Sequence, residues 1–143
     1  MPPLTRYLVA IAVGAAYGWL APMFWRYFLA VSPVPDWLLE NFAKPGHVAL
    51  YNISSHSLAL LMNVILAAPV AAALVAYRRS NSWQCALIAA SAAVLTAYWG
   101  MEFSSLLTLI SSGHFWLGVV LAFLPIPIAF LVFRAVRRQP ALP

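Results

Sequence analysis

Two ionisable side chains, His56 and Glu102, lie within long apolar stretches of this 143-residue chain. A charged side chain inside a bilayer is costly, so it usually faces a charged partner or a water-filled cavity. Glu102 lies seven residues before Leu109, the expected outer end of its stretch, and so about 10 Å deep in a helix. His56 lies eight residues after Val48, the expected outer end of another stretch, and so about 12 Å deep. The matching depths predict a hydrogen bond or ion pair between His56 and Glu102, which would favour the charged form of both side chains.

Both side chains belong to a polar face of an expected helix, because polar residues recur at spacings of three, four and seven. These residues are Asn52, His56 and Asn63 on one helix and Ser91, Tyr98, Glu102 and Ser105 on the other. Two interpretations follow. The faces either form interhelical hydrogen bonds that fix the packing, worth about 0.6 kcal/mol each, or line a polar cavity that opens to the outer side and binds a ligand or partner.

These residues match no metal-binding or catalytic motif. His47, His56 and His114 occur without an HxxxH, HExxH or CxxCH pattern, so we expect no metal, haem or other cofactor. The lone Cys85 cannot form a disulfide within the chain. No serine lies in a GxSxG motif, and the apolar stretches contain no aspartate that could orient His56. We therefore expect that the protein is not an enzyme.

The elements that must position these side chains are membrane-spanning helices. The chain is 64% hydrophobic and 8% charged, whereas soluble domains are about 45–50% apolar and about 25% charged. The net charge is +5, but the basic residues lie at the ends of apolar stretches, which excludes a nucleic-acid-binding module. We expect a single domain over residues 1–143.

Four apolar stretches are long enough to cross about 30 Å of hydrocarbon, which takes about 20 residues. They predict an all-α membrane protein with four transmembrane helices in an antiparallel bundle, over approximately residues 7–25, 48–77, 83–109 and 115–133. Pro125 and Pro127 predict a kink near the middle of the last helix. The first stretch also fits a secretory signal peptide, but its apolar run is longer than a typical signal core, which favours an uncleaved helix.

The outer loop 26–47 is long enough to contain a short helix. Pro35 suits a first helical turn, and Pro45–Gly46 would end the helix. Charged and apolar residues fall on separate faces: Asp36, Glu40 and Lys44 on one, and Leu38, Leu39 and Phe42 on the other. We expect a helix at the membrane interface. It would either cover the ends of the membrane-spanning helices or control the access of a ligand or partner.

The basic residues indicate how the chain is oriented. Six of the eight fall on one side of the expected spans: Arg6, Arg78, Arg79, Arg134, Arg137 and Arg138. Short loops rich in lysine and arginine stay in the cytoplasm. We therefore expect a multi-pass protein of the inner or plasma membrane with both termini cytoplasmic.

Small residues at spacings of four suggest where helices approach closely. They are Ala10, Gly14 and Gly18 on the first helix, which include a GxxxG match, and Ala89, Ala93 and Ala97 on the third. The two stripes could pack against each other within one chain, or the first could join copies in a homo-oligomer.

These features favour a small membrane protein that recognises a partner or small ligand through its outer-side polar residues, as an accessory, assembly or protective subunit does. The alternative is a small homo-oligomeric transporter or channel in which Glu102 and His56 bind a cation or relay protons. Transport needs a polar route to both sides, but the inner halves of the spans offer only Asn63 and Ser91. The expected partners are the lipid bilayer and either a second copy or another membrane protein.

Overall fold

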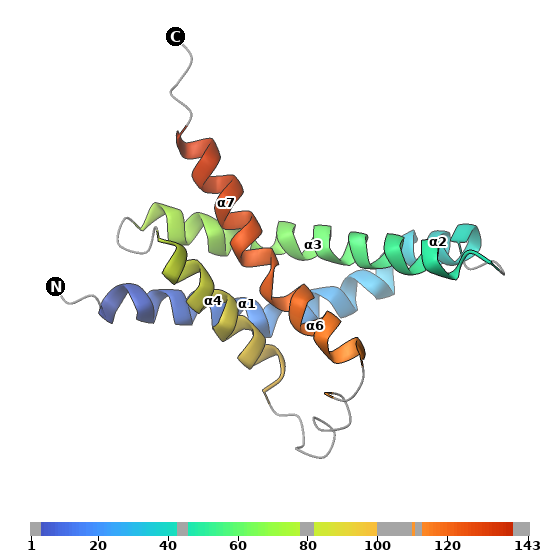
Figure 1. Cartoon of the computed structure of the whole chain (residues 1–143), viewed down its shortest axis with the longest axis horizontal. Helices are drawn as coiled ribbons and strands as arrows, with labels where there is room; N and C mark the ends of the chain where they lie inside the picture. The colour runs from blue at the N-terminus through green and yellow to red at the C-terminus, as the bar shows by residue number, and fades with distance from the viewer. Residues whose placement is uncertain (1–3, 43–45, 78–81, 100–109, 111–112, 139–143) are drawn as a thin grey trace, which may run out of the picture.

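The computed structural model describes residues 4–42, 46–77, 82–99, 110 and 113–138, which are helical apart from short turns and connections. Two helices are long, α1 (Leu4–Val31) and α3 (Val48–Ala76). The shorter helices are α2 (Val34–Phe42), α4 (Trp83–Ala97), α6 (Gly113–Phe123) and α7 (Pro125–Arg138) (Figure 1).

Three segments are long and apolar enough to cross a membrane, namely Leu4–Val31, Val48–Ala76 and Phe115–Arg137, and Trp83–Ala97 is a shorter apolar helix. Only 28% of the most apolar window of each long segment is buried within the protein. Large apolar side chains such as Leu95 and Trp99 are exposed instead, as contact with lipid rather than water requires. The described residues form helices and no strands, and their long apolar helices fit the expected helical membrane protein.

Helix α1 is longer than the span expected over residues 7–25. It continues through Arg26 and ends at Val31, because a charged residue at the membrane surface does not interrupt helical hydrogen bonds. Pro33 ends it, since proline has no amide hydrogen and disfavours a helical residue before it. The Ser32 hydroxyl then accepts a hydrogen bond from the Val34 amide at 3.2 Å, at the start of α2. Helix α2 is the short helix expected in the outer loop.

The helix expected over residues 83–109 is not continuous, because α4 ends at Ala97; residues 100–109 lie outside the described ranges. The Tyr98 amide donates to the Val94 carbonyl at 3.1 Å, and the Trp99 amide donates three residues back to Thr96 at 3.2 Å, which is the tighter turn common at helix ends. At 15 residues, α4 rises about 22 Å, less than the hydrocarbon thickness.

The last apolar stretch is divided in two at Leu124, between α6 and α7. Pro125 begins α7 and Pro127 lies in its first turn, where a missing amide hydrogen costs little. Leu124 precedes a proline and is therefore biased away from helical backbone. The kink expected near the prolines is present as a break, and the helical residues extend beyond the expected 115–133 on both sides.

Helices α1 and α3 run in opposite directions along the long axis of the molecule, with α2 at one end (Figure 1). Helix α4 packs on α1, and α7 packs on α3. Helix α4 and the α6–α7 segment are inclined to this long pair in the same view, so the packing differs from a regular bundle of aligned helices.

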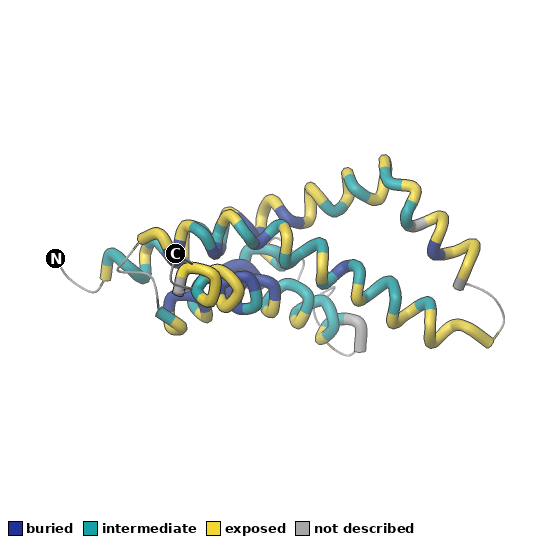
Figure 2. The backbone as a smooth tube through the Cα atoms, turned by 90° about the horizontal axis from the view of Figure 1, so that it is seen from above, coloured by how far each residue is buried: buried dark blue, intermediate teal, exposed yellow. Residues whose placement is uncertain are grey.

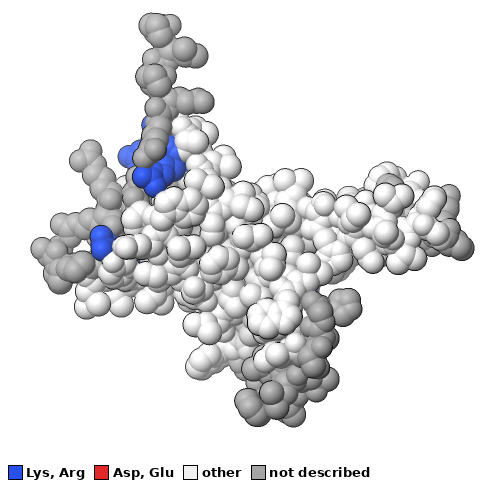
Figure 3. Space-filling model, viewed as in Figure 1, with Lys and Arg blue, Asp and Glu red and all other residues white. Residues whose placement is uncertain are grey.

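The two ends of the molecule differ in burial and charge. We call the end with the start of α1, the start of α4 and the C-terminal parts of α3 and α7 the arginine end, because blue surface gathers there in Figure 3. The opposite end, with α2, is the α2 end. Buried positions concentrate in the half of the molecule that contains α4 (Figure 2), including Leu74, Cys85 and Phe130.

Candidate functional site

The small-residue stripes of α1 and α4 lie against each other. A Cβ atom added at Gly14 would lie 2.1 Å from the Ala89 carbonyl oxygen, and one added at Gly18 would lie 2.2 Å from that of Ala93. Ala10 is fully buried as well. The stripe on α1 is therefore covered by α4 of the same chain, and the two helices run in the same direction.

Beyond this contact, toward the α2 end, α1, α3, α4 and α6 line an open cavity of about 340 Å³, which we call the four-helix cavity. Small and apolar residues make up most of its wall, including Ala59, Ala93, Leu121 and Ala122. Four side chains with polar groups join them: Tyr17 and Trp25 from α1, Asn63 from α3 and Tyr98 from the turn after α4. Two of the residues expected at the site, Asn63 and Tyr98, are thus brought together.

Tyr17 links α1 to α3 at the cavity wall. Its side chain is only 5% exposed. Its hydroxyl donates to the backbone carbonyl of Asn63 at 3.1 Å and lies 3.4 Å from the Asn63 side-chain oxygen. The Asn63 amide nitrogen donates to the Ala59 carbonyl at 2.8 Å. These bonds orient the Asn63 amide group at the wall.

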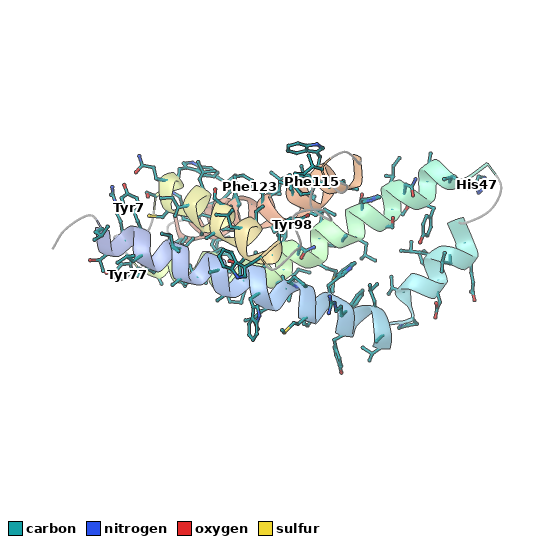
Figure 4. All side chains as sticks on the ribbon, turned by 90° about the horizontal axis from the view of Figure 1, so that it is seen from below. Tyr7, His47, Tyr77, Tyr98, Phe115 and Phe123 are labelled. Carbon is teal, nitrogen blue, oxygen red and sulfur yellow. The ribbon has the colours of Figure 1, made fainter. Side chains whose placement is uncertain are left out.

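Tyr98 lies between α4 and α6. Its ring packs against that of Phe115, with 5.3 Å between the two ring centroids; both residues are labelled in Figure 4. A Cβ atom added at Gly118 would lie 2.4 Å from the Tyr98 hydroxyl oxygen, so the glycine leaves room for the phenol against α6. Within the described ranges, no hydrogen bond is made by this hydroxyl, which is half-buried at the cavity.

Sequence reasoning missed Tyr17, Pro22 and Gly118, which all line the cavity. Tyr17 lies beside Gly14 and Gly18 on the small-residue face. A large aromatic residue among small ones is the sequence signal that could have identified it as part of a cavity wall. Pro22 has no amide hydrogen, so the Gly18 carbonyl loses its helical donor.

His56 and Asn52 do not line the four-helix cavity. The Nδ1–H of His56 donates to the Asn52 backbone carbonyl one turn earlier in α3, so its contact is local. Counted from Ala76 at the arginine end, His56 is 20 residues along α3, about 30 Å. His56 therefore lies toward the α2 end of α3, far from the arginine end.

The expectation that Ser91 lies on an inward-facing side of α4 is wrong, because Ser91 is exposed. Alanines occupy the buried face of α4, and Ser91 lies roughly opposite to them. Tyr98 shares the spacing of Ser91 but reaches the cavity because the helix ends before it. Glu102 and Ser105 lie outside the described residues, so the His56–Glu102 pair stays a prediction.

A second cavity of about 560 Å³ lies between α1 and α3 and shares Tyr17 and Ala21 with the first. Apart from the hydroxyls of Tyr17 and Tyr27, its lining side chains are apolar, with Leu66 and Pro69 from α3. Such a surface suits hydrocarbon chains and offers little to fix a ligand's orientation. The four-helix cavity is therefore the better candidate site.

In the part of the chain that the structure describes, no group of three or more histidine, cysteine, aspartate or glutamate side chains could hold a metal ion. Comparisons with family models, with curated proteins and with solved structures find no match for the chain.

Proposed function

We propose that this membrane protein binds a small lipophilic molecule with one carbonyl or hydroxyl group in the four-helix cavity. The observation that carries the proposal is the meeting of Tyr17, Asn63 and Tyr98 in a cavity whose wall is mostly small and apolar. Ligand sites are typically apolar hollows with a few placed polar groups. The Tyr98 hydroxyl can donate to a carbonyl or accept from a hydroxyl, and apolar walls accommodate the rest of the molecule.

The donor set favours binding over catalysis. Phenols and an amide hold a ligand by hydrogen bonds but lack an activated nucleophile or a paired acid and base. The protein would act as an accessory, assembly or protective subunit. Because α4 covers the glycine stripe of α1, a second copy or another membrane protein would meet the chain on other surfaces.

The transporter or channel alternative receives less support. Between the cavity and the arginine end, Ala10 and Ala86 are buried and Gly14 packs against the Ala89 backbone, and these side chains offer ions no polar path. His56 would have to act at the end of α3 far from the arginine end, whereas Glu102 lies outside the described residues. Flux of a cation through vesicles, lost in Glu102→Gln, is the result that would favour transport.

We also propose four membrane crossings in an inner or plasma membrane, with the arginine end and both termini cytoplasmic. The clustering of arginines at one end supports this orientation. In a Cys85→Ala background, Asn81→Cys should resist an impermeant maleimide added to intact cells, whereas Lys44→Cys should react. The reverse pattern would overturn the orientation.

The binding proposal is tested with two probes, 1-naphthol and naphthalene, which differ by one hydroxyl. The purified protein in detergent should be stabilised by 1-naphthol, by about 1.4 kcal/mol at about ten times its Kd, and less by naphthalene. Tyr98→Phe should remove the difference between the probes. Tyr77→Phe, at the arginine end, is the matched control and should retain it.

A second variant tests the cavity by shape. Gly118→Ala should displace the Tyr98 phenol, whose free end can move, and so weaken 1-naphthol binding with little loss of stability. Equal stabilisation by both probes, or a preference for 1-naphthol that survives in Tyr98→Phe, would overturn the proposed site.

A further inference from the structure

A separate cleft lies at the arginine end, away from the four-helix cavity. It has a volume of about 340 Å³ and is lined by Trp83 at the start of α4 and by Leu131, Arg134 and Ala135 of α7. We call it the arginine cleft. It combines one cation with apolar and aromatic surface.

Aromatic packing positions the cation of the cleft. The Arg134 guanidinium carbon lies 6.0 Å from the ring centroid of Phe130, which is fully buried. The Trp83 ring lies 5.8 Å from the same Phe130 ring. Arg134 is half-buried and has no acidic partner within the described ranges, so its charge is available to an external anion.

The surroundings of the cleft are strongly positive. Arg137 donates to the Val75 carbonyl near the end of α3. Arg6 lies over the Tyr7 ring at 4.5 Å, and the Tyr7 hydroxyl donates to Gln84 of α4. The acidic residues are elsewhere in the chain: Asp36 and Glu40 lie on α2, at the opposite end, and Glu102 lies outside the described ranges. The potential at this end therefore favours an anion.

We propose that the arginine cleft binds the headgroup of an anionic phospholipid. The guanidinium of Arg134 would contact the phosphate, since arginine pairs well with phosphate oxygens. Trp83 is an aromatic residue of the type that settles at membrane interfaces, and the exposed Leu131 side chain continues the cleft as apolar surface for an acyl chain. A free phosphate ion would leave this apolar lining unused, which favours a lipid.

The test uses the purified full-length chain in nonionic detergent, with dioleoylphosphatidylglycerol and dioleoylphosphatidylcholine as probes. They carry the same acyl chains, but only the first has a net charge. Native mass spectrometry should show preferential binding of phosphatidylglycerol. Arg134→Gln should weaken that binding about fivefold, since one arginine near an anionic surface contributes about 1 kcal/mol.

Arg26→Gln, an exposed arginine far along α1, is the matched control and should bind phosphatidylglycerol like the wild type. Independently of any variant, the preference for phosphatidylglycerol should fall as sodium chloride rises from about 50 mM to about 500 mM. Equal binding of both lipids, unchanged binding in Arg134→Gln, a preference insensitive to salt, or displacement of the lipid by millimolar inorganic phosphate would each overturn the proposal.

Discussion

The arginine end and the α2 end are built from similarly apolar residues but packed in different ways. At the arginine end, Leu74, Cys85 and Phe130 are fully buried, and small residues bring α1 and α4 into backbone contact. At the α2 end, Leu38 is buried, whereas Val31 is 60% exposed and Ile53 is 64% exposed. Apolar composition alone does not bury a side chain in a membrane protein, because lipid is as apolar as the neighbouring helix.

The four-helix cavity lies where these two kinds of packing meet. Gly18 and Ala93 belong to the close contact and also line the cavity. Toward the α2 end from these two residues, α4 ends, and the cavity wall contains the large residues Tyr98 and Trp25 instead of small ones. The end of one short helix among longer ones thus creates both the space and the edge at which polar groups can be placed.

The largest expected effect comes from the α1–α4 contact. Gly14→Leu and Gly18→Leu should each destabilise the protein by about 3 kcal/mol or more, because their Cβ atoms meet backbone that cannot move aside. Thermal unfolding in detergent measures the loss. The control, Ala12→Leu, changes an exposed position on the same helix. If all three variants had equal stability, the proposed difference in packing between the arginine end and the α2 end would be contradicted.

Phe130→Ala tests the α7 side of the same packed end. The ring is fully buried against neighbours that include Trp83, so its loss should cost about 3 kcal/mol through the cavity left behind. Phe133→Ala, on the same helix but 37% exposed, should cost less than about 1 kcal/mol. Similar losses of unfolding free energy in the two variants would contradict the burial described here.

Tyr17→Phe tests the boundary between the two ends and should cost about 1 kcal/mol, the loss of one interhelical hydrogen bond in lipid. The shorter contact is to the backbone of Asn63, at 3.1 Å against 3.4 Å to its side chain. Most of the loss should therefore persist in an Asn63→Leu background. A double-mutant cycle measures this coupling, and a large coupling would show that the side-chain contact dominates.

Leu38→Ala should have the smallest effect, below about 1 kcal/mol on global unfolding, because α2 can separate from α3 without disturbing the arginine end. Faster proteolysis within loop 26–47 should reveal the local loosening. Leu39→Ala, 49% exposed on the same helix, should change neither measurement. A loss for Leu38→Ala as large as that for Phe130→Ala would remove the contrast between the two ends.

Local patterns in the sequence were sufficient for several elements. The helix predicted over residues 48–77 closely matches α3, because a long apolar run that ends at Arg78–Arg79 is a strong signal of a membrane-spanning helix. The end of α4 was missed, since the apolar pattern continues beyond Ala97 and the turn depends on local hydrogen bonds. The charge of Arg26 predicts the end of the apolar span but not the end of the helix, which continues to Val31 because a charged side chain leaves the backbone hydrogen bonds intact.

The sequence by itself determined the helical class, the apolar segments and which residues share a helix face, because these properties depend on neighbours three or four positions apart. It also placed Gly14 and Ala89 on small-residue faces. Only the tertiary structure decided that these faces meet, that Tyr17 bonds to Asn63, and that Tyr98 turns into the cavity while Ser91 faces outward. The reason is that lipid and protein are equally apolar surroundings, so the choice among helix faces depends on steric fit and a few polar contacts between distant residues.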